Sequence, residues 1–596
     1  MTKSTKADPI LLALFANRFM SIAEAMGRSL QQTSISTNIK ERLDFSCAIF
    51  APDGDLVANA PFIPIHLGSM SFAVKYQMKL HAKDLQEGDV LMTNSPRAGG
   101  SHLPDITIIT PVFSRPESTG EKPEIIFFTA SRGHHADVGG ILPGSMPPTS
   151  INIFEEGAEV VSFKIVSKGK FDRDGLWDLM VERPARYEGC SGCRNFKDVE
   201  SDLKAQIAAN HKGIRLLHAL VNEYTLPTVH EYMNHIRANA EFCVRQLLRD
   251  VVKRTGSNIL EAVDYLDDGS PIHLRVEIDK EKGSAILDFA GTGSEVRGNL
   301  NAPISVVHSA VIYCMRAMLG TDIPLNAGCL VPIEIKIPPE SFLLPTHTAA
   351  VCGGNVLTSQ RIVDVVLKSF DACAASQGCT NNLTFGAGGK DKNGVVKAGW
   401  GYYEASTIAG GSGAGHDWHG TSGVHTHITN TRIGDIELLE RRYPVLIHEF
   451  GLRENSGGKG KWNGGDGVRR VFEFTEKLQV SILSERRTRQ PYGMYGGEPG
   501  AFGRNTWIKQ CRPEDSDVVE EVDKEPAQAP RNTRVINIGG KATIMMGKGD
   551  KLVIETPGGG AWGSKKEEEN TAEDKWKPEW SARGSWKDRE ALQAEF

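Results

Sequence analysis

The stretches GDVLMTNSPRAGGSHLPDITIITPVF, at residues 88–113, and IIFFTASRGHHADVGG, at residues 125–140, decide how this chain folds around its chemistry. Their apolar runs are rich in β-branched and aromatic residues, which predicts buried strands. The loops at the strand ends carry five side chains of metal-binding types: His102, Asp105, His134, His135 and Asp137. Imidazole and carboxylate together suit a divalent ion that keeps one coordination position free for water or substrate.

A purely structural role for these five residues is the alternative. Histidines at strand ends often satisfy backbone groups, and aspartates in loops often cap turns. Two separate loops, each with histidine and aspartate at the end of a predicted strand, are harder to explain in this way. We therefore favour a metal site.

Length and composition set the class of protein. A chain of 596 residues is long enough for two or more packed lobes. Helical and strand patterns are both present, so we expect a mixed α/β (α+β) fold with mixed sheets. The net charge of −6 gives no reason to expect nucleic acid as a partner. Neither a secretory signal nor a membrane-length apolar run is visible, which predicts a cytosolic protein with reduced cysteines and no membrane contact.

Hydrophobic periodicity predicts the main elements. Helices are expected over residues 9–31, 305–319 and 359–376, and over 198–250, where a second helical stretch covers about 230–248. A hairpin is expected over residues 45–57, strands over 273–278, 284–293 and 331–338, and a loop-dense, mostly β structure after residue 400. We expect a metal-bearing lobe at about 34–200 and a further α/β lobe at about 256–512. Residues 513–531 predict an acidic surface excursion, and residues 564–596 a charged, disordered tail.

Other sequence features are weaker candidates for a site. His425 and His427 are two residues apart, so on a strand both would face the same side, in the wall of a substrate cavity or on a metal. The pair Cys190 and Cys193 has no second pair to complete a zinc site. No phosphate-binding loop of the G-x-x-x-x-G-K-[ST] type is present, so we expect no nucleotide-binding residues in this chain.

Several longer motifs resemble the hydantoinase B/oxoprolinase family. They are NIKERLDFSCAIF (38–50), IPIHLGSM (63–70), GGSHLPD (99–105), RGHHADVGGILPGSMPP (132–148), GNLNAP (298–303), GGNVLTSQRIVD (353–364), SGVHTHITNTR (422–432) and the closing TPGGGAWG. The resemblance covers residues 8–563 and is closest to the C-terminal half of eukaryotic-type 5-oxoprolinases. It implies ATP-dependent hydrolysis of a cyclic amide, 5-oxo-L-proline to L-glutamate in glutathione metabolism, with an (N-methyl)hydantoinase subunit or a non-catalytic remnant as alternatives.

The resemblance also implies roles for particular residues. It assigns a divalent ion (Mn, Zn or Mg) to His102, Asp105 and His134, with Asp137 or His135 as general base. For the substrate carboxylate we expect a clamp from Arg132, Asn355 and Arg361, next to a cavity wall with His425 and His427. ATP is expected on an A-type partner subunit or fused half, in an oligomeric assembly. One departure from the family pattern is Ser95, where histidine or aspartate is expected.

Overall fold

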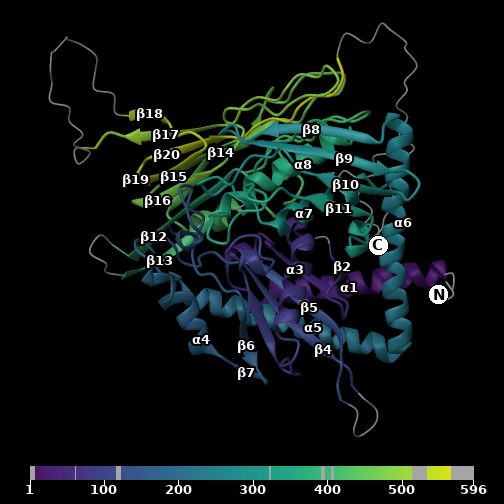
Figure 1. Cartoon of the computed structure of the whole chain (residues 1–596). Helices are drawn as coiled ribbons and strands as arrows, with labels where there is room; N and C mark the ends of the chain where they lie inside the picture. Colours follow the sequence, from purple (N-terminus) through teal and green to yellow (C-terminus); the bar gives the residue numbers. More distant parts are fainter. Residues whose placement is uncertain are drawn as a thin grey trace, which may run out of the picture.

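The computed structural model describes residues 7–60, 62–115, 122–320, 324–390, 396–404, 408–512 and 533–564. These residues form a mixed α+β fold with four β-sheets, which confirms the predicted fold class (Figure 1). The predicted excursion at 513–531 and all but the first residue of the predicted tail lie outside the described residues.

The first sheet is antiparallel and contains both stretches that open the sequence. Its seven strands follow the order β2-β1-β5-β4-β3-β6-β7. Their bounds are β1 Phe45–Phe50, β2 Leu56–Asn59, β3 Val90–Thr93, β4 Asp105–Phe113, β5 Ile125–His134, β6 Phe163–Ser167 and β7 Lys170–Phe171. The central strands are buried on both faces, which explains why their sequences are apolar with little alternation.

Helices cover both faces of this sheet. On one face lie α1 (Pro9–Thr33), α5 (Phe196–Tyr224) and the start of α6 (Leu226–Thr255); on the other lies α3 (Pro64–Leu80). Neighbouring residues of β5 show the alternation, because Phe127 packs in the α1 core and Phe128 packs in the α3 core. The predicted helix over 9–31 is confirmed, with Asp8 accepting a capping hydrogen bond from Ile10 N at 2.8 Å.

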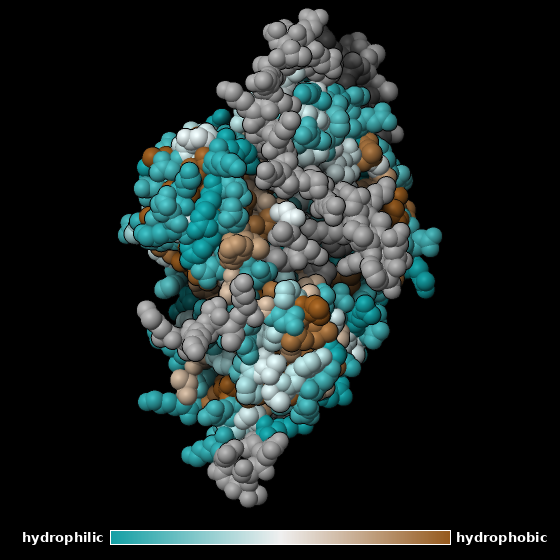
Figure 2. All heavy atoms as spheres, turned by 90° about the vertical axis from the view of Figure 1, so that its right-hand side faces the viewer, coloured by the Kyte–Doolittle hydropathy of each residue, from teal (hydrophilic) through white to brown (hydrophobic). Residues whose placement is uncertain are grey.

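Helix α1 corrects one expectation. Among the described helices it is long and apolar enough to span a membrane by length and composition alone. Its Phe15, Phe19 and Met26 are fully buried against α5, α6 and the first sheet, so it serves as a core helix in this fold. The face that carries α6 is mainly hydrophilic, with apolar groups in small separate areas (Figure 2).

A second layer stacks on α3. Helix α7 (Ile304–Met318) packs on α3 and on α8 (Ser359–Ser369), and α8 packs on the second sheet, of order β11-β10-β9-β8. Its strands are β8 Ile259–Tyr265, β9 Pro271–Asp279, β10 Ser284–Asp288 and β11 Ile333–Lys336, with β10 and β11 parallel. The helix predicted over 359–376 ends earlier, because Asp371 has a φ of 49° and Asp364 accepts a hydrogen bond from Ser376 N.

The last part of the chain is mostly β, as predicted. The third sheet contains β13 (Val396–Glu404), β12 (Asn382–Lys390), β16 (Leu478–Leu483) and β19 (Lys541–Met546). The fourth contains β14 (Val445–Arg453), β15 (Gly467–Phe474), β20 (Lys551–Glu555), β17 (Arg504–Gln510) and β18 (Thr533–Asn537). Short helices are α2 (Thr37–Lys40), α4 (Arg173–Trp177) and α9 (Ile436–Arg442). Strands β18, β19 and β20 complete these sheets, so they are grouped with the residues after 256, which are called the second lobe below; the residues before 256 are called the first lobe.

Candidate metal centre

The register of the first sheet brings two of the predicted ligands together. Asp105 is the first residue of β4 and lies directly opposite His134, the last residue of β5. On the other side of β5, the backbone N–H of His134 donates to the carbonyl oxygen of Asp44, just before β1. The three residues therefore form one row across the end of the sheet.

A tight loop supplies the third ligand, His102. At Gly100 a Cβ atom would lie 2.1 Å from the carbonyl oxygen of Asn94, so only glycine fits there. The side-chain amide of Asn94 fixes the loop, because it donates hydrogen bonds to the carbonyl oxygens of Leu103 and Ala158 at 2.7 and 2.8 Å. Ser95 donates to Glu159 and does not line the cavity described below, so the departure from the family pattern lies outside it.

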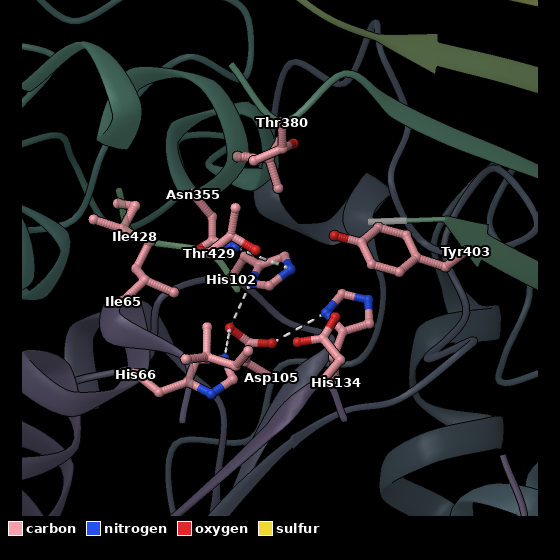
Figure 3. Close-up of a pocket in the computed structure, with 13 residues that line it drawn as sticks. Ile65, His66, His102, Asp105, His134, Asn355, Thr380, Tyr403, Ile428 and Thr429 are labelled. Atoms are coloured by element: carbon pink, nitrogen blue, oxygen red, sulfur yellow. Dashed lines mark hydrogen bonds and ion pairs between the residues drawn. The ribbon is translucent and has the colours of Figure 1, made fainter. Parts of the chain in front are cut away.

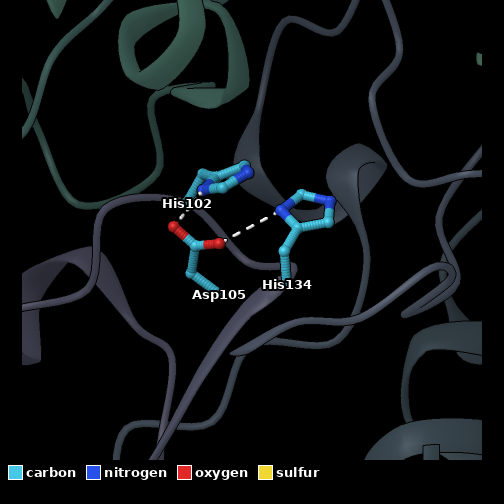
Figure 4. Close-up of side chains that lie close together, drawn as sticks. All are labelled: His102, Asp105 and His134. Atoms are coloured by element: carbon cyan, nitrogen blue, oxygen red, sulfur yellow. Dashed lines mark hydrogen bonds and ion pairs between the residues drawn. The ribbon is translucent and has the colours of Figure 1, made fainter. Parts of the chain in front are cut away.

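The side chains of His102 and His134 converge on the carboxylate of Asp105 (Figure 4). Oδ2 of Asp105 lies 3.0 Å from His102 Nδ1, and Oδ1 lies 3.1 Å from His134 Nδ1. One potential ligand atom from each residue can be chosen so that all lie within 4.8 Å of one another, and all three residues are buried. The structure thus assembles a two-histidine, one-carboxylate group that can hold a metal ion.

A third histidine, His66 of α3, completes the surroundings of Asp105. Its Nε2 lies 3.2 Å from Asp105 Oδ2, and its Nδ1 lies 3.1 Å from Ser46 Oγ. Ser101 also donates to Asp105 Oδ2, at 2.5 Å. Sequence reasoning missed His66, although the motif IPIHLGSM contains it, because a single histidine in a helix gives no ligand pattern.

Burial and neighbouring groups set the protonation states. Burial lowers the pKa of His134 to about 3, so its imidazole is neutral. Burial alone would raise the pKa of Asp105, but His102 and His66 hold it well below its usual range. Burial, with the charge of Asp105, raises the pKa of Asp44 to about 8. A neutral imidazole beside an ionised carboxylate is the state that a metal ion requires of its ligands.

A small cavity opens beside the cluster, and the second lobe closes it (Figure 3). Its remaining lining residues are Asp44, Ile63, Ile65, His66, Asn355, Val356, Thr380, Tyr403, Ile428 and Thr429. The ring of Tyr403 stacks on His134 with centroids 3.8 Å apart. The lining therefore includes residues of both lobes and not of the first one alone.

Asn355 is the predicted substrate residue that the structure brings to the cavity. Its Nδ2 lies 3.4 Å from His102 Nε2, in a short π-helical turn from Gly354 to Thr358. A Cβ at Gly354 would lie 1.9 Å from the carbonyl oxygen of Asn301, so the turn needs glycine. The buried carboxylate of Glu156 accepts the backbone N–H groups of Val351 and Cys352, both at 3.0 Å, and fixes the segment before this turn.

Two residues beside the cluster point away from the cavity. Arg132 is fully buried and donates to Thr107, Ser69 and the carbonyl oxygen of Gly99. His135 follows His134 and so faces the opposite side of the sheet, where its Nε2 lies 3.0 Å from Gln206 Oε1 of α5. Neither lines the cavity, so this geometry does not support Arg132 as a substrate clamp or His135 as a general base.

Asp137 and Arg361 also have structural partners. The Asp137 carboxylate pairs with Arg194 at 3.0 Å and accepts the backbone N–H groups of Gly139 and Gly144. Arg361 pairs with Asp264 at 3.0 Å in a buried ion network beneath α8. Both lie outside the cavity lining, so the expected roles of general base and clamp have no geometric support.

His425 and His427 belong to the loop that forms the cavity wall but do not line the cavity themselves. His425 Nδ1 lies 3.4 Å from Thr431 Oγ1. His427 has a φ of 57°, and its Nε2 lies 3.2 Å from Asp364 Oδ1. This contact anchors the loop, and the two residues that follow, Ile428 and Thr429, face the cavity.

Comparisons with known proteins agree with this architecture. Residues 8–565 match the family model described as hydantoinase B/oxoprolinase. The chain is 53% identical over 571 residues to 5-oxoprolinase 1 of Arabidopsis thaliana, with 94% of this chain and 42% of that protein covered. It is 34% identical over 567 residues to an uncharacterized protein of Methanocaldococcus jannaschii, with 94% and 91% covered.

One solved structure shares the fold. The ATP-dependent caprolactamase from Pseudomonas jessenii superposes with a TM-score of 0.77 at 23% identity, covering 94% of this chain and 92% of that chain. This chain spans less than half the length of the plant relative, whereas it spans most of the archaeal one. A protein of about this length and a much longer protein therefore both contain this architecture.

Proposed function

Because the chain belongs to the hydantoinase B/oxoprolinase family, we propose that it is the metal-dependent hydrolytic half of a cytosolic, ATP-dependent enzyme that opens 5-oxo-L-proline to L-glutamate. One observation carries the proposal: His102, Asp105 and His134 converge beside a cavity, in a chain 53% identical to a plant 5-oxoprolinase over 571 residues. None of the described cysteines forms a disulfide bond, which supports a cytosolic location.

The residues present fit a divalent ion. Two imidazoles and one carboxylate form a donor set that suits zinc and manganese, and they leave positions open for other ligands. His134 Nε2 is buried and has no hydrogen-bond partner among the described residues. Such a buried nitrogen is expected to bind a ligand that the chain itself does not supply. When bound, such an ion supplies Lewis acidity that polarises a carbonyl oxygen and lowers the pKa of water.

The chain's own residues orient this group and limit the access of water. Asp105 is held by His66 and Ser101, so its carboxylate has one orientation. Tyr403 covers one face of His134, and Ile65 and Ile428 add apolar walls. A lactam is a stabilised amide, so phosphorylation of its oxygen would make the ring carbon a better electrophile. We assign this step to an ATP-binding A-type half, separate or fused.

A neutral ring is the second candidate substrate, and one observation favours it. None of the described residues that line the cavity is lysine or arginine, and Arg132 and Arg361 have structural partners elsewhere. A hydantoin has no carboxylate and needs no cationic clamp. A hydantoinase subunit therefore stays the alternative to a 5-oxoprolinase.

Reconstitution tests the proposal. With an A-type half supplied, the chain should convert 5-oxo-L-proline to glutamate with stoichiometric cleavage of ATP, as measured by coupled assays of glutamate and ADP. The Asp105→Asn variant is the matched negative control, because it keeps the shape of the side chain but removes its charge. Turnover of hydantoin without turnover of 5-oxoproline would replace the leading substrate with the second one.

A further inference from the structure

Tyr403 carries a hydroxyl that forms no hydrogen bond within the part of the chain that the structure describes. The residue lies near the end of β13, is 1% exposed and lines the cavity. Arg42 Nη1 donates to its backbone carbonyl oxygen at 2.7 Å, but no described residue bonds to the hydroxyl. The hydroxyl of a buried tyrosine normally has a partner, so this one points to a ligand.

The ring of Tyr403 fixes the position of this hydroxyl. It stacks on the imidazole of His134, with centroids 3.8 Å apart and an angle of 15° between the planes. In Figure 3 the ring reaches inward from β13, and its hydroxyl is directed toward the side where His102 lies. Pairing with β12, where Thr384 lies opposite Tyr403, holds the backbone in place. The hydroxyl therefore faces the cavity beside two of the candidate metal ligands.

The chemistry of the hydroxyl and the size of the cavity limit what can meet it. Burial raises the pKa of Tyr403 well above its usual range, so the phenol is neutral and can donate a hydrogen bond. The space open to the centre of a water molecule is about 20 Å³. On that measure one water needs roughly 10–15 Å³, so the cavity admits the oxygen-bearing end of a ligand but not a whole ring.

We propose, on the basis of the proposed function, that Tyr403 is a substrate-binding residue. Its hydroxyl donates a hydrogen bond to the oxygen on the reacting carbon of the cyclic amide, or to a phosphoryl oxygen once that oxygen is phosphorylated. An oxygen acceptor between the candidate metal ligands and this hydroxyl is oriented from two sides. The second lobe thus contributes a donor to a site whose metal-type ligands come from the first lobe.

Removal of the hydroxyl alone separates ligand binding from structure. Tyr403→Phe keeps the ring over His134, and its thermal unfolding midpoint should not fall, because no described residue loses a hydrogen bond. Tyr402→Phe is the matched control, since Tyr402 packs against Phe385 and Tyr443 and does not line the cavity. In the reconstituted enzyme, Tyr403→Phe should lower kcat/KM for 5-oxo-L-proline by about tenfold or more, and Tyr402→Phe should stay within about twofold of wild type.

Binding to the full chain gives a readout that does not depend on turnover. The metal-loaded chain is titrated calorimetrically with inorganic phosphate and with 5-oxo-L-proline. Tyr403→Phe should raise the Kd of at least one of them by about tenfold or more, with unchanged metal content. An effect on phosphate alone assigns the donor to the phosphoryl oxygen, and an effect on 5-oxo-L-proline alone assigns it to the carbonyl oxygen.

Equal binding of both compounds by wild type and Tyr403→Phe, including no binding by either, would overturn the inference. A lower unfolding midpoint or a lower metal content in Tyr403→Phe would also overturn it, because the hydroxyl would then have a structural role. If the reconstituted wild type opens no ring, the proposed function fails. Weaker binding of phosphate by Tyr403→Phe would in that case still support the hydroxyl as a donor to a ligand.

Discussion

At the scale of single residues, His134 and His135 show how one position decides a role. They are adjacent in sequence, but successive side chains of a strand point to opposite faces of the sheet. His134 therefore faces Asp105 and the cavity, whereas His135 faces Gln206 of α5. Two adjacent histidines thus lie on opposite faces of the sheet.

This separation predicts different effects on metal binding. His134→Ala removes one of three ligands, so the purified chain should lose most of its bound divalent ion; His102→Ala should do the same. His135→Ala is the matched control and should keep about one ion per chain, because its imidazole lies outside the cavity. Elemental analysis after dialysis gives the answer, with thermal unfolding to verify folding. Equal metal content in His134→Ala and His135→Ala would refute the assignment of His134 as a metal ligand.

The sequence could predict only part of the candidate site. His102, Asp105 and His134 stand at strand ends, so local patterns and the family resemblance suggested them, and the structure brings them together. His66, Thr380 and Tyr403 could not be found, because they reach the cavity through long-range packing that no local pattern encodes. Arg132 and Arg361 had the right charge for a clamp, but Arg132 donates to Thr107 and other neutral buried groups, and Arg361 pairs with Asp264.

At the scale of elements, helices were predicted better than the turns that carry function. The bounds of α1 and α7 follow the apolar periodicity within a few residues. The π-helical turn at 354–358 was not predicted, because its shape depends on the approach of Gly354 to Asn301 and on the carboxylate of Glu156. Such a turn places Asn355, and its position is set by residues far away in sequence.

Glu156 should therefore matter for stability as well as for the site. Glu156→Gln replaces an acceptor that receives two backbone N–H groups and the Ser150 hydroxyl, so we expect the free energy of unfolding to fall by about 1–3 kcal/mol. Burial raises the pKa of Glu156, so its ionisation costs stability as pH rises above the unfolded value, and the loss should shrink at higher pH. Urea unfolding at several pH values measures this.

The neighbouring Glu155→Gln serves as the control for that experiment. Glu155 is only partly buried, and it caps its own loop through Ile151 and Asn152. Its replacement should cost less stability than that of Glu156 at every pH. An equal loss in both variants would show that the buried carboxylate does not anchor the 351–355 segment.

At the scale of the whole molecule, the candidate site depends on both lobes. The first sheet supplies Asp105 and His134, and the segments around Asn355, Thr380 and Thr429 close the cavity from the second lobe. The contact of α3 with α7 holds the two layers together at this place. A fold of this kind explains why the site was only half visible from the sequence of the first lobe.

ATP is expected to bind to another half of the enzyme and not to this chain. The stretch most similar to a phosphate-binding loop, Gly386 to Lys390, lies within β12, where its backbone pairs with β13 and, at Gly386, also with β16 instead of facing a phosphate. The plant relative is more than twice as long as the stretch it shares with this chain, which leaves room for an ATP-binding half.

The isolated chain should therefore bind its divalent ion but neither bind ATP tightly nor hydrolyse it. Calorimetric titration with magnesium-ATP measures this, with the full-length plant enzyme as the positive control. A micromolar dissociation constant for ATP on this chain alone would contradict the division into two halves, because the nucleotide would then have a site within these residues.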